Sequence, residues 1–188
     1  MTTVLTDEEL ALKALQDMQC FEILIERYQG KLTHYIRRIS HFSEMEIEEV
    51  LQEVFIKLWK NLNDFDQDMK FSTWVYRIAH NQTISSWRKS KSRGDTDRAH
   101  LEPEFFDQIA DEFDFIKNVE AKFTAERVQA VLTKLPEKYR HILILRFVED
   151  LSYDEISDVL QKPPGTVATL LNRAKAQFKN LYLQHEPN

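Results

Sequence analysis

The segment spanning residues 70–93 concentrates the side chains that could bind a charged ligand. It contains six Lys or Arg and no Asp or Glu, whereas the whole chain has a formal net charge of −6. Two Trp and one Tyr are interleaved with these cations. Cations attract phosphates and aromatic rings stack on bases, so the combination predicts a nucleic-acid-binding face. Trp74 falls at core spacing and is expected to pack inward, and Ser72 is expected to cap the start of a basic helix.

The stretch before it, residues 47–62, has a different character. Its apolar residues recur three, four, seven and eight positions apart, which predicts one buried face along a whole helix. The opposite face carries mostly Glu and Lys, with Gln52 and Ile56 among them. Such a face fits either an ordinary solvated helix or a protein partner that supplies Arg side chains and an apolar pocket.

Helices are predicted throughout residues 1–93, which contain one Gly and no Pro. Two capping-box pairs, Thr6 with Glu9 and Ser43 with Glu46, mark helix starts. The apolar spacing predicts further helices over about 7–18 and 21–41, and a turn-rich break over about 61–69.

The charge changes sign after Gly94. Residues 95–120 contain nine acidic and two basic residues, with Phe and Ile among them. A solvated tether between domains accounts for the charge. The aromatic residues instead favour an acidic segment that occupies a basic groove on a partner or shields the basic helix. Both interpretations make residues 94–122 an acidic linker.

The second domain is predicted to end in a helix-turn-helix. Ser152 with Glu155 forms a third capping box, for a short helix over 153–160. Two Pro and a Gly then make a tight turn over 161–165, and Thr166 is expected to open a longer helix. A short helix, a tight turn and a longer helix are typical of DNA-binding helix-turn-helix units.

Composition limits the class of protein. A chain of 188 residues allows one or two small domains, and a single Cys excludes an internal disulfide. No run approaches the ~20 apolar residues of a membrane span, and the acidic N-terminus lacks a signal-peptide pattern, so we expect a cytoplasmic protein. The scattered His residues show no metal-ligand spacing. We find no phosphate-binding loop, nucleophile motif or paired carboxylates, and therefore expect no catalytic residue, metal or cofactor.

Two stretches resemble a known family. Region two of bacterial sigma factors is similar to EEVLQEVFIKLW followed by FSTWVYRIAHN. Region four of the same family is similar to LPEKYRHILILRFVEDLSYDEISDVLQKPPGTV. Their order, with no region three between them, resembles the extracytoplasmic-function (ECF) subgroup of the sigma-70 family. The resemblance covers about residues 6–93 and 123–182. It implies an all-α fold of two small helical domains, a sigma region 2 bundle at 1–93 and a sigma region 4 helix-turn-helix domain at 123–188.

The resemblance also implies a function. A protein of this family binds core RNA polymerase through the beta-prime and beta subunits, directs it to particular promoters and helps to open the DNA, without catalysing a reaction itself. Many members act in stress responses and are held inactive by an anti-sigma factor, so such a partner is implied here. The resemblance does not imply that this chain itself inserts into a membrane.

The family's motifs assign residues to three surfaces. The polymerase-binding surface comprises Glu49, Gln52, Glu53, Ile56 and Lys57. The surface for the minus-ten promoter element comprises Lys70, Arg77, Asn81, Trp87, Arg88, Lys89, Lys91 and Arg93. Asn81 matches a position near the pocket for a flipped-out base, which the loop over residues 63–71 is expected to complete. The surface for the minus-thirty-five element comprises Arg146, Tyr153, Thr166, Ala168, Thr169, Asn172, Arg173 and Lys175.

The last helix departs from the family's pattern. After Gly-Thr-Val the family usually has a cation, Ser and Arg, whereas this chain has Ala168, Thr169 and Leu170. Losing two charges weakens phosphate binding, although Ala and Thr methyl groups can contact thymine methyls. The sequence also allows a stand-alone helix-turn-helix regulator, or a sigma-like protein that acts through protein–protein contacts. It does not specify the promoters, the anti-sigma factor or the placement of the two domains.

Overall fold

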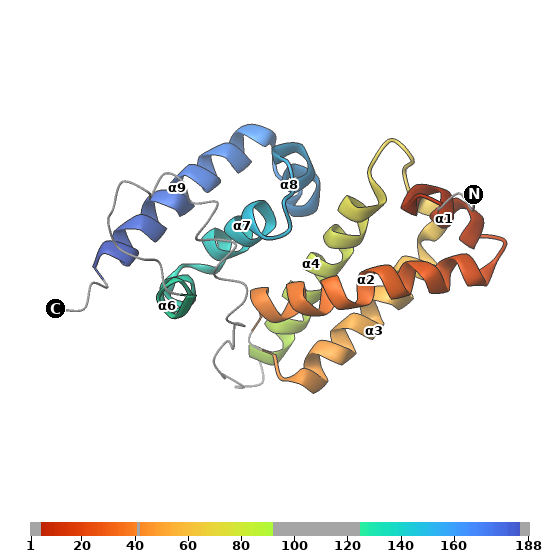
Figure 1. Ribbon diagram of the computed structural model, residues 1–188, viewed down its shortest axis with the longest axis horizontal. Helices are drawn as coiled ribbons and strands as arrows, with labels where there is room; N and C mark the ends of the chain where they lie inside the picture. The colour runs from red at the N-terminus through yellow and green to blue at the C-terminus, as the bar shows by residue number, and fades with distance from the viewer. Residues whose placement is uncertain (1–4, 41, 92–124, 185–188) are drawn as a thin grey trace. The chain divides into compact units, whose positions relative to one another are not determined.

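The computed structural model describes residues 5–40, 42–91 and 125–184, and within these residues every regular element is a helix (Figure 1). The elements in chain order are α1 (Asp7–Ala14), α2 (Met18–Ile39), α3 (Glu44–Lys60), the 3-10 helix η1 (Leu62–Asp64), α4 (Phe71–Lys91), α6 (Ala125–Lys134), α7 (Glu137–Phe147), α8 (Tyr153–Leu160) and α9 (Pro164–Leu183).

The chain splits into two compact units, one built from α1 to α4 and the other from α6, α7, α9 and the first turns of α8. The predicted all-α fold with two small helical domains is therefore confirmed. The predicted linker, residues 94–122, lies outside the described residues.

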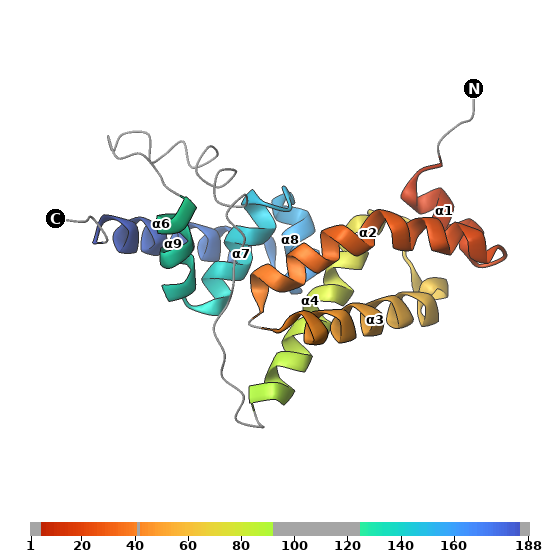
Figure 2. The same ribbon diagram turned by 60° about the horizontal axis from the view of Figure 1, so that its bottom comes forward.

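In the first unit, α2 contacts α1, α3 and α4, and α3 also contacts α4 (Figures 1 and 2). The core between them is apolar, and several of its side chains are completely buried: Leu32, Tyr35, Ile36, Val54 and Val75. These residues recur at helical spacing, so each helix turns one continuous apolar face inward. Removing such side chains from water supplies most of the free energy that holds the helices together.

Local capping explains where α1 and α3 begin. Both predicted capping boxes are present: the side chain of Thr6 accepts from the N–H of Glu9, and that of Ser43 accepts from the N–H of Glu46. In each box the Glu carboxylate accepts the N–H of the capping residue in return. Each box satisfies two backbone donors that a helix start would otherwise leave without partners.

The start of α4 is held differently. Its first N–H, that of Phe71, donates to the Glu8 carboxylate of α1 at 2.9 Å, across a sequence separation of 63 residues. The prediction that Ser72 caps this helix is wrong, because α4 has already begun at Phe71. A carboxylate from another helix takes the place of a local cap, and the helix dipole favours a negative charge there.

In the second unit, α9 packs against α6 and α7. Helix α7 is central to this unit, since Ile142, Leu143, Ile144 and Leu145 in its middle are all fully buried. Four consecutive buried residues surround the helix on every side, so α7 lies inside this unit's core.

The helix-turn-helix has the predicted order, with one shift at its second helix. The Ser152–Glu155 capping box is present at the start of α8. Gln161 ends α8 in the left-handed conformation, with φ of 50°. The last helix begins at Pro164, two residues before the predicted start at Thr166. Proline suits a first helical turn because its missing N–H would have no partner there.

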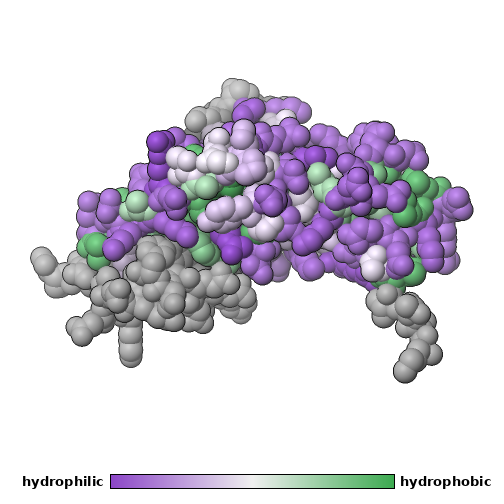
Figure 3. All heavy atoms as spheres, turned by 90° about the horizontal axis from the view of Figure 1, so that it is seen from above, coloured by the Kyte–Doolittle hydropathy of each residue, from purple (hydrophilic) through white to green (hydrophobic). Residues whose placement is uncertain are grey.

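The described surface is largely hydrophilic in the view of Figure 3, with hydrophobic residues confined to limited areas. None of the described helices is long and apolar enough to span a lipid bilayer.

Candidate nucleic-acid and protein interface

The five residues predicted to bind a protein partner all lie on the solvent-exposed face of α3. Glu49, Gln52, Glu53 and Lys57 are exposed, and Ile56 exposes 46% of its surface. An exposed Ile flanked by carboxylates and an amide presents an apolar anchor with polar groups around it. This is the chemistry of a small protein-binding hot spot.

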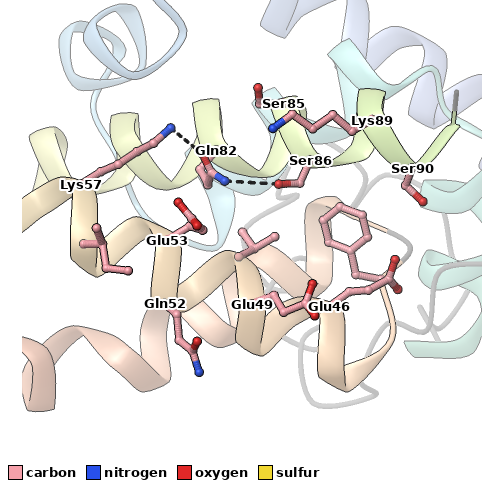
Figure 4. Close-up of a pocket in the computed structure, with 13 residues that line it drawn as sticks. Glu46, Glu49, Gln52, Glu53, Lys57, Gln82, Ser85, Ser86, Lys89 and Ser90 are labelled. Atoms are coloured by element: carbon pink, nitrogen blue, oxygen red, sulfur yellow. Dashed lines mark hydrogen bonds between the residues drawn. The ribbon is translucent and has the colours of Figure 1, made fainter. Parts of the chain in front are cut away.

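A groove runs between this face and α4 (Figure 4). All five predicted partner-binding residues contribute to its α3 side, together with Phe42, Glu46 and Val50. The α4 side is formed by Gln82, Ser85, Ser86, Lys89 and Ser90. The acidic side chains thus gather on one wall and a Lys with hydroxyl groups on the other, so a partner in the groove would meet both helices.

A short chain of hydrogen bonds crosses the groove floor. Lys57 donates from Nζ to Oε1 of Gln82 at 2.5 Å, and Gln82 donates from Nε2 to the Ser86 hydroxyl at 3.3 Å (Figure 4). Gln82 is only 5% exposed. Sequence reasoning missed Gln82, because the face of α4 that meets α3 is decided by packing. Its position next to Asn81 in a basic segment was the only signal.

The predicted minus-ten residues divide between two faces of α4. Asn81 lies four positions after Arg77, and Arg88 lies eleven positions after Arg77. The three residues therefore share one side of a helix with 3.6 residues per turn. Asn81 and Arg88 are exposed and Arg77 is half-buried. Lys89 lies instead on the groove side. The structure therefore brings together one amide and two guanidinium groups in a row that a nucleic-acid strand could follow.

The remaining members of this set fall at the ends of the segment. Lys70 is exposed immediately before α4, and Trp87 is half-buried near its C-terminal end. The side chain of Lys91 and all of Arg93 lie outside the described residues.

Most aromatic rings of α4 are used for packing. The predicted inward position of Trp74 is confirmed at 4% exposure, and Tyr76, at 5%, stacks edge-on against Tyr35 with ring centroids 5.1 Å apart. Among the Trp and Tyr residues in the described part of α4, Trp87 alone keeps a partly exposed ring. It is therefore the ring of this helix best placed to stack on a base.

The loop between η1 and α4 is anchored by rings. Phe65 is buried against Phe71 and Trp74, with ring centroids 5.3 and 5.4 Å away. After it, the Asp66 carboxylate accepts the N–H of Asp68 at 3.0 Å, a side-chain turn typical of Asp. Residues 66–68 and Lys70 are exposed. The loop thus exposes the polar residues 66–68 and Lys70 to solvent, while the buried ring of Phe65 holds its start in place.

On α9, the predicted DNA-facing residues form a central row with two flanking positions. Thr166, Thr169, Asn172 and Arg173 are exposed, whereas Ala168 and Lys175 are half-buried. The opposite side of the helix is the buried one, lined by Val167, Leu171, Ala174, Phe178 and Tyr182. The exposed row is mostly uncharged, as the departure from the family's pattern predicted.

Arg146 is tied to the turn that precedes the helix-turn-helix. It donates to the carbonyl oxygen of Leu151 at 2.9 Å and lies 3.6 Å from the Asp150 carboxylate. Its guanidinium also lies over the ring of Tyr153, 6.0 Å from the centroid. Lys175 lies 5.1 Å over the ring of Phe147, and burial, with a smaller effect of the Arg146 charge, lowers its pKa. Of these two predicted DNA-binding cations, Arg146 thus already has the Asp150 carboxylate beside it, and Lys175 has an aromatic ring beneath it.

Comparison with family models matches both units. The model "Sigma-70 region 2" matches residues 24–93, and the model "Sigma-70, region 4" matches residues 125–178. The groove and the row on α4 fall within the first match, and the helix-turn-helix up to residue 178 falls within the second.

Curated relatives cover nearly the whole chain. The ECF RNA polymerase sigma factor SigW of Bacillus subtilis is 33% identical over 170 residues, covering 87% of this chain and 89% of the relative. The RNA polymerase sigma-H factor of Pseudomonas aeruginosa is 34% identical over 182 residues, covering 93% of each. The ECF RNA polymerase sigma-E factor of Escherichia coli K12 is 31% identical over 189 residues, covering 96% of each.

Solved structures show the same fold. CnrH, in complex with the cytosolic domain of CnrY, aligns with a TM-score of 0.68 at 24% identity, covering 96% of this chain and 99% of CnrH. The sigma factor RpoE of Bartonella quintana, in complex with the anti-sigma factor NepR, aligns with a TM-score of 0.65 at 17% identity, covering 89% and 98%.

Proposed function

This chain belongs to the ECF subgroup of the sigma-70 family, and we propose that its two helical units divide promoter recognition between them. As a sigma factor it directs RNA polymerase to initiate transcription at promoters. We assign region 2 function to residues 1–93 and region 4 function to residues 123–188, with residues 94–122 as the linker. The observation that carries this division is that each unit presents its own exposed polar row, on α4 and on α9.

In this proposal the exposed face of α3 binds the beta-prime subunit of the core polymerase. Ile56 enters an apolar pocket, and Glu49 and Glu53 pair with cations on the partner. Gln52 supplies hydrogen bonds at the centre of the face. Because the groove joins this face to α4, binding of the polymerase and binding of the promoter take place on adjacent surfaces of one unit.

The row on α4 binds the minus-ten element as its strands separate. Unstacking bases costs a few kcal/mol per step, and stacking a base on an aromatic ring returns ~1–3 kcal/mol. Trp87 is the ring proposed for this role. Arg77 and Arg88 bind phosphates, which hold the strand without reading it. Asn81, whose amide both donates and accepts hydrogen bonds, reads the edge of a flipped base beside the loop at 63–71.

The second unit binds the minus-thirty-five element through α9 in the major groove. Thr169, Asn172 and Arg173 face the bases, while Arg146 and Lys175 hold a backbone phosphate. With few cations in the exposed row, this contact depends less on salt than it would with the family's usual charges.

An anti-sigma factor is the further partner we propose. CnrH and RpoE, which share this fold, were each solved in complex with a partner, which for RpoE is an anti-sigma factor. The exposed Ile56 and the carboxylates around it are the surface that such a protein would cover to block polymerase binding.

The decisive experiment combines Gln52→Ala with Ile56→Glu in the full chain. The double variant removes the central amide and puts a charge in place of the apolar anchor, so we expect at least a tenfold loss of affinity for purified core polymerase in a pull-down. Run-off transcription from a promoter library should fall with it. Circular dichroism should remain that of the wild type.

A matched control makes the same substitutions on α2, as Ile23→Glu with Gln29→Ala, at two exposed positions outside the proposed surface. The control should bind polymerase normally. Normal binding by the α3 variant, or equal loss in both, would remove the assignment of this face.

A further inference from the structure

The position of the loop at residues 63–71 depends on what holds its two ends. Its first half is fixed by Phe65, which is buried against the rings of Phe71 and Trp74. Its second half ends at the N–H of Phe71, the first donor of α4. Between these points the chain is mostly exposed, so the position of residues 66–70 is set by the two anchors.

The second anchor is Glu8. Its carboxylate accepts the Phe71 N–H at 2.9 Å. The first N–H groups of a helix have no partner within the helix, and a carboxylate is the acceptor that the helix dipole favours there. Removing it leaves a donor without its partner and lets the first turn of α4 fray.

The neighbouring residue, Asp7, ties this part of α1 to α2. Asp7 accepts from Arg27 at 2.6 Å and from the Tyr28 hydroxyl. The ring of Tyr28 packs edge-on against Phe71, with centroids 5.8 Å apart. The contacts therefore form a closed circuit, from Asp7 through Tyr28 and Phe71 back to Glu8. Through this circuit α1 and α2 both determine where the loop meets α4.

We propose that Glu8 is a positioning residue for minus-ten recognition, acting through the backbone of Phe71 on the loop at 63–71. Helix α1 precedes the part of the chain that matches the region 2 model, which begins at residue 24. It therefore adds a support for the loop from outside that match. The inference rests on the proposed role of Asn81 and this loop in reading the minus-ten element.

The test compares Glu8→Ala with Glu8→Gln in the full-length protein. Alanine removes the acceptor, whereas glutamine keeps an oxygen that can accept the Phe71 N–H. Each variant is assembled with core polymerase and transcribes a library randomised at both promoter elements, and the transcripts are sequenced. Glu8→Ala should reduce base preference within the minus-ten element about fivefold, the scale on which losing a helix cap shifts a local equilibrium. Preference at the minus-thirty-five element should not change.

A second measurement reports on the anchor without transcription. Hydrogen–deuterium exchange of the free protein should be faster across residues 66–73 in Glu8→Ala, and close to wild type in Glu8→Gln. Glu22→Ala, which removes the same charge from an exposed position on α2, should match the wild type in both experiments.

The outcomes separate the inference from the function it rests on. Asn81→Ala should flatten the minus-ten profile whether or not Glu8 positions the loop. If Asn81→Ala flattens it and Glu8→Ala does not, the positioning role is wrong and the proposed recognition stands. If neither changes the profile, the proposed recognition fails too. An even drop in transcription from Glu8→Ala, with both profiles intact, would show a purely structural residue and overturn the proposal.

Discussion

At the scale of single residues, the first unit buries an ionisable group in its core. The Tyr35 hydroxyl lies 2.9 Å from Nδ1 of His80, which is 9% exposed. Burial lowers the pKa of His80 from 6.5 to about 4. The folded protein therefore keeps this imidazole neutral at pH values where an unfolded chain would protonate it.

This difference predicts a loss of stability in acid. As the pH falls below 6.5, His80 becomes protonated in the unfolded chain, whereas in the folded chain it becomes protonated only near pH 4. The free energy of unfolding therefore decreases as the pH falls across that window. Between pH 7 and pH 5 the contribution of His80 is about 2 kcal/mol. In urea titrations at both pH values, wild type should lose about that much more stability than His80→Gln. Equal losses would show that His80 is not the group responsible.

At the scale of elements, each helix start depends on particular acceptors. Helix α8 is only eight residues long, and its first turn is held by the Ser152–Glu155 box, with N–H to oxygen distances of 2.7 and 3.3 Å. Short helices gain little from propensity alone, so a cap is a large part of their stability. This helix directly precedes α9, the helix proposed to bind the minus-thirty-five element.

Replacing Ser152 by alanine or by glycine should therefore lower the stability of the second unit by different amounts. Ser152→Ala is expected to destabilise the second unit by about 1 kcal/mol, whereas Ser152→Gly should lower its stability by only a few tenths, because glycine is tolerated at a helix N-cap. Thermal unfolding followed by circular dichroism measures both. An alanine variant as stable as the glycine variant would mean that the box contributes little.

At the scale of the whole molecule, the two units have separate apolar cores, and we expect them to unfold separately. Leu32 in the first and Leu143 in the second are both fully buried. All three tryptophans of the chain, Trp59, Trp74 and Trp87, belong to the first unit. Tryptophan fluorescence therefore reports on the first unit, while circular dichroism reports on both.

Truncating one core side chain in each unit tests whether the units unfold separately. Leu32→Ala is expected to cost roughly 2–5 kcal/mol and to lower the urea midpoint seen by fluorescence. Leu143→Ala should destabilise the second unit by a similar amount, shifting part of the circular dichroism transition without moving the fluorescence midpoint. If Leu143→Ala moves the fluorescence midpoint as far as Leu32→Ala does, the units unfold as one.

Part of the candidate site could be predicted because helical phase is a local property. The spacing of Arg77, Asn81 and Arg88 already places them on one side of a helix. Whether Lys89 belongs with them or with the groove could not be predicted, because that depends on which side of α4 the neighbouring α3 covers. Gln82 was missed for the same reason.

The sequence by itself determined the helices, the three capping boxes and the family, since each is encoded within a few neighbouring residues or in contiguous motifs. The tertiary structure alone decided the contacts between distant residues: Glu8 on the Phe71 N–H, Tyr35 beside His80, and Lys57 on Gln82. Ser72 shows the difference most clearly, because its local pattern was that of a cap and a carboxylate from another helix had already taken the role. Such pairings depend on how whole helix faces pack, and the spacing of residues along one helix does not contain that information.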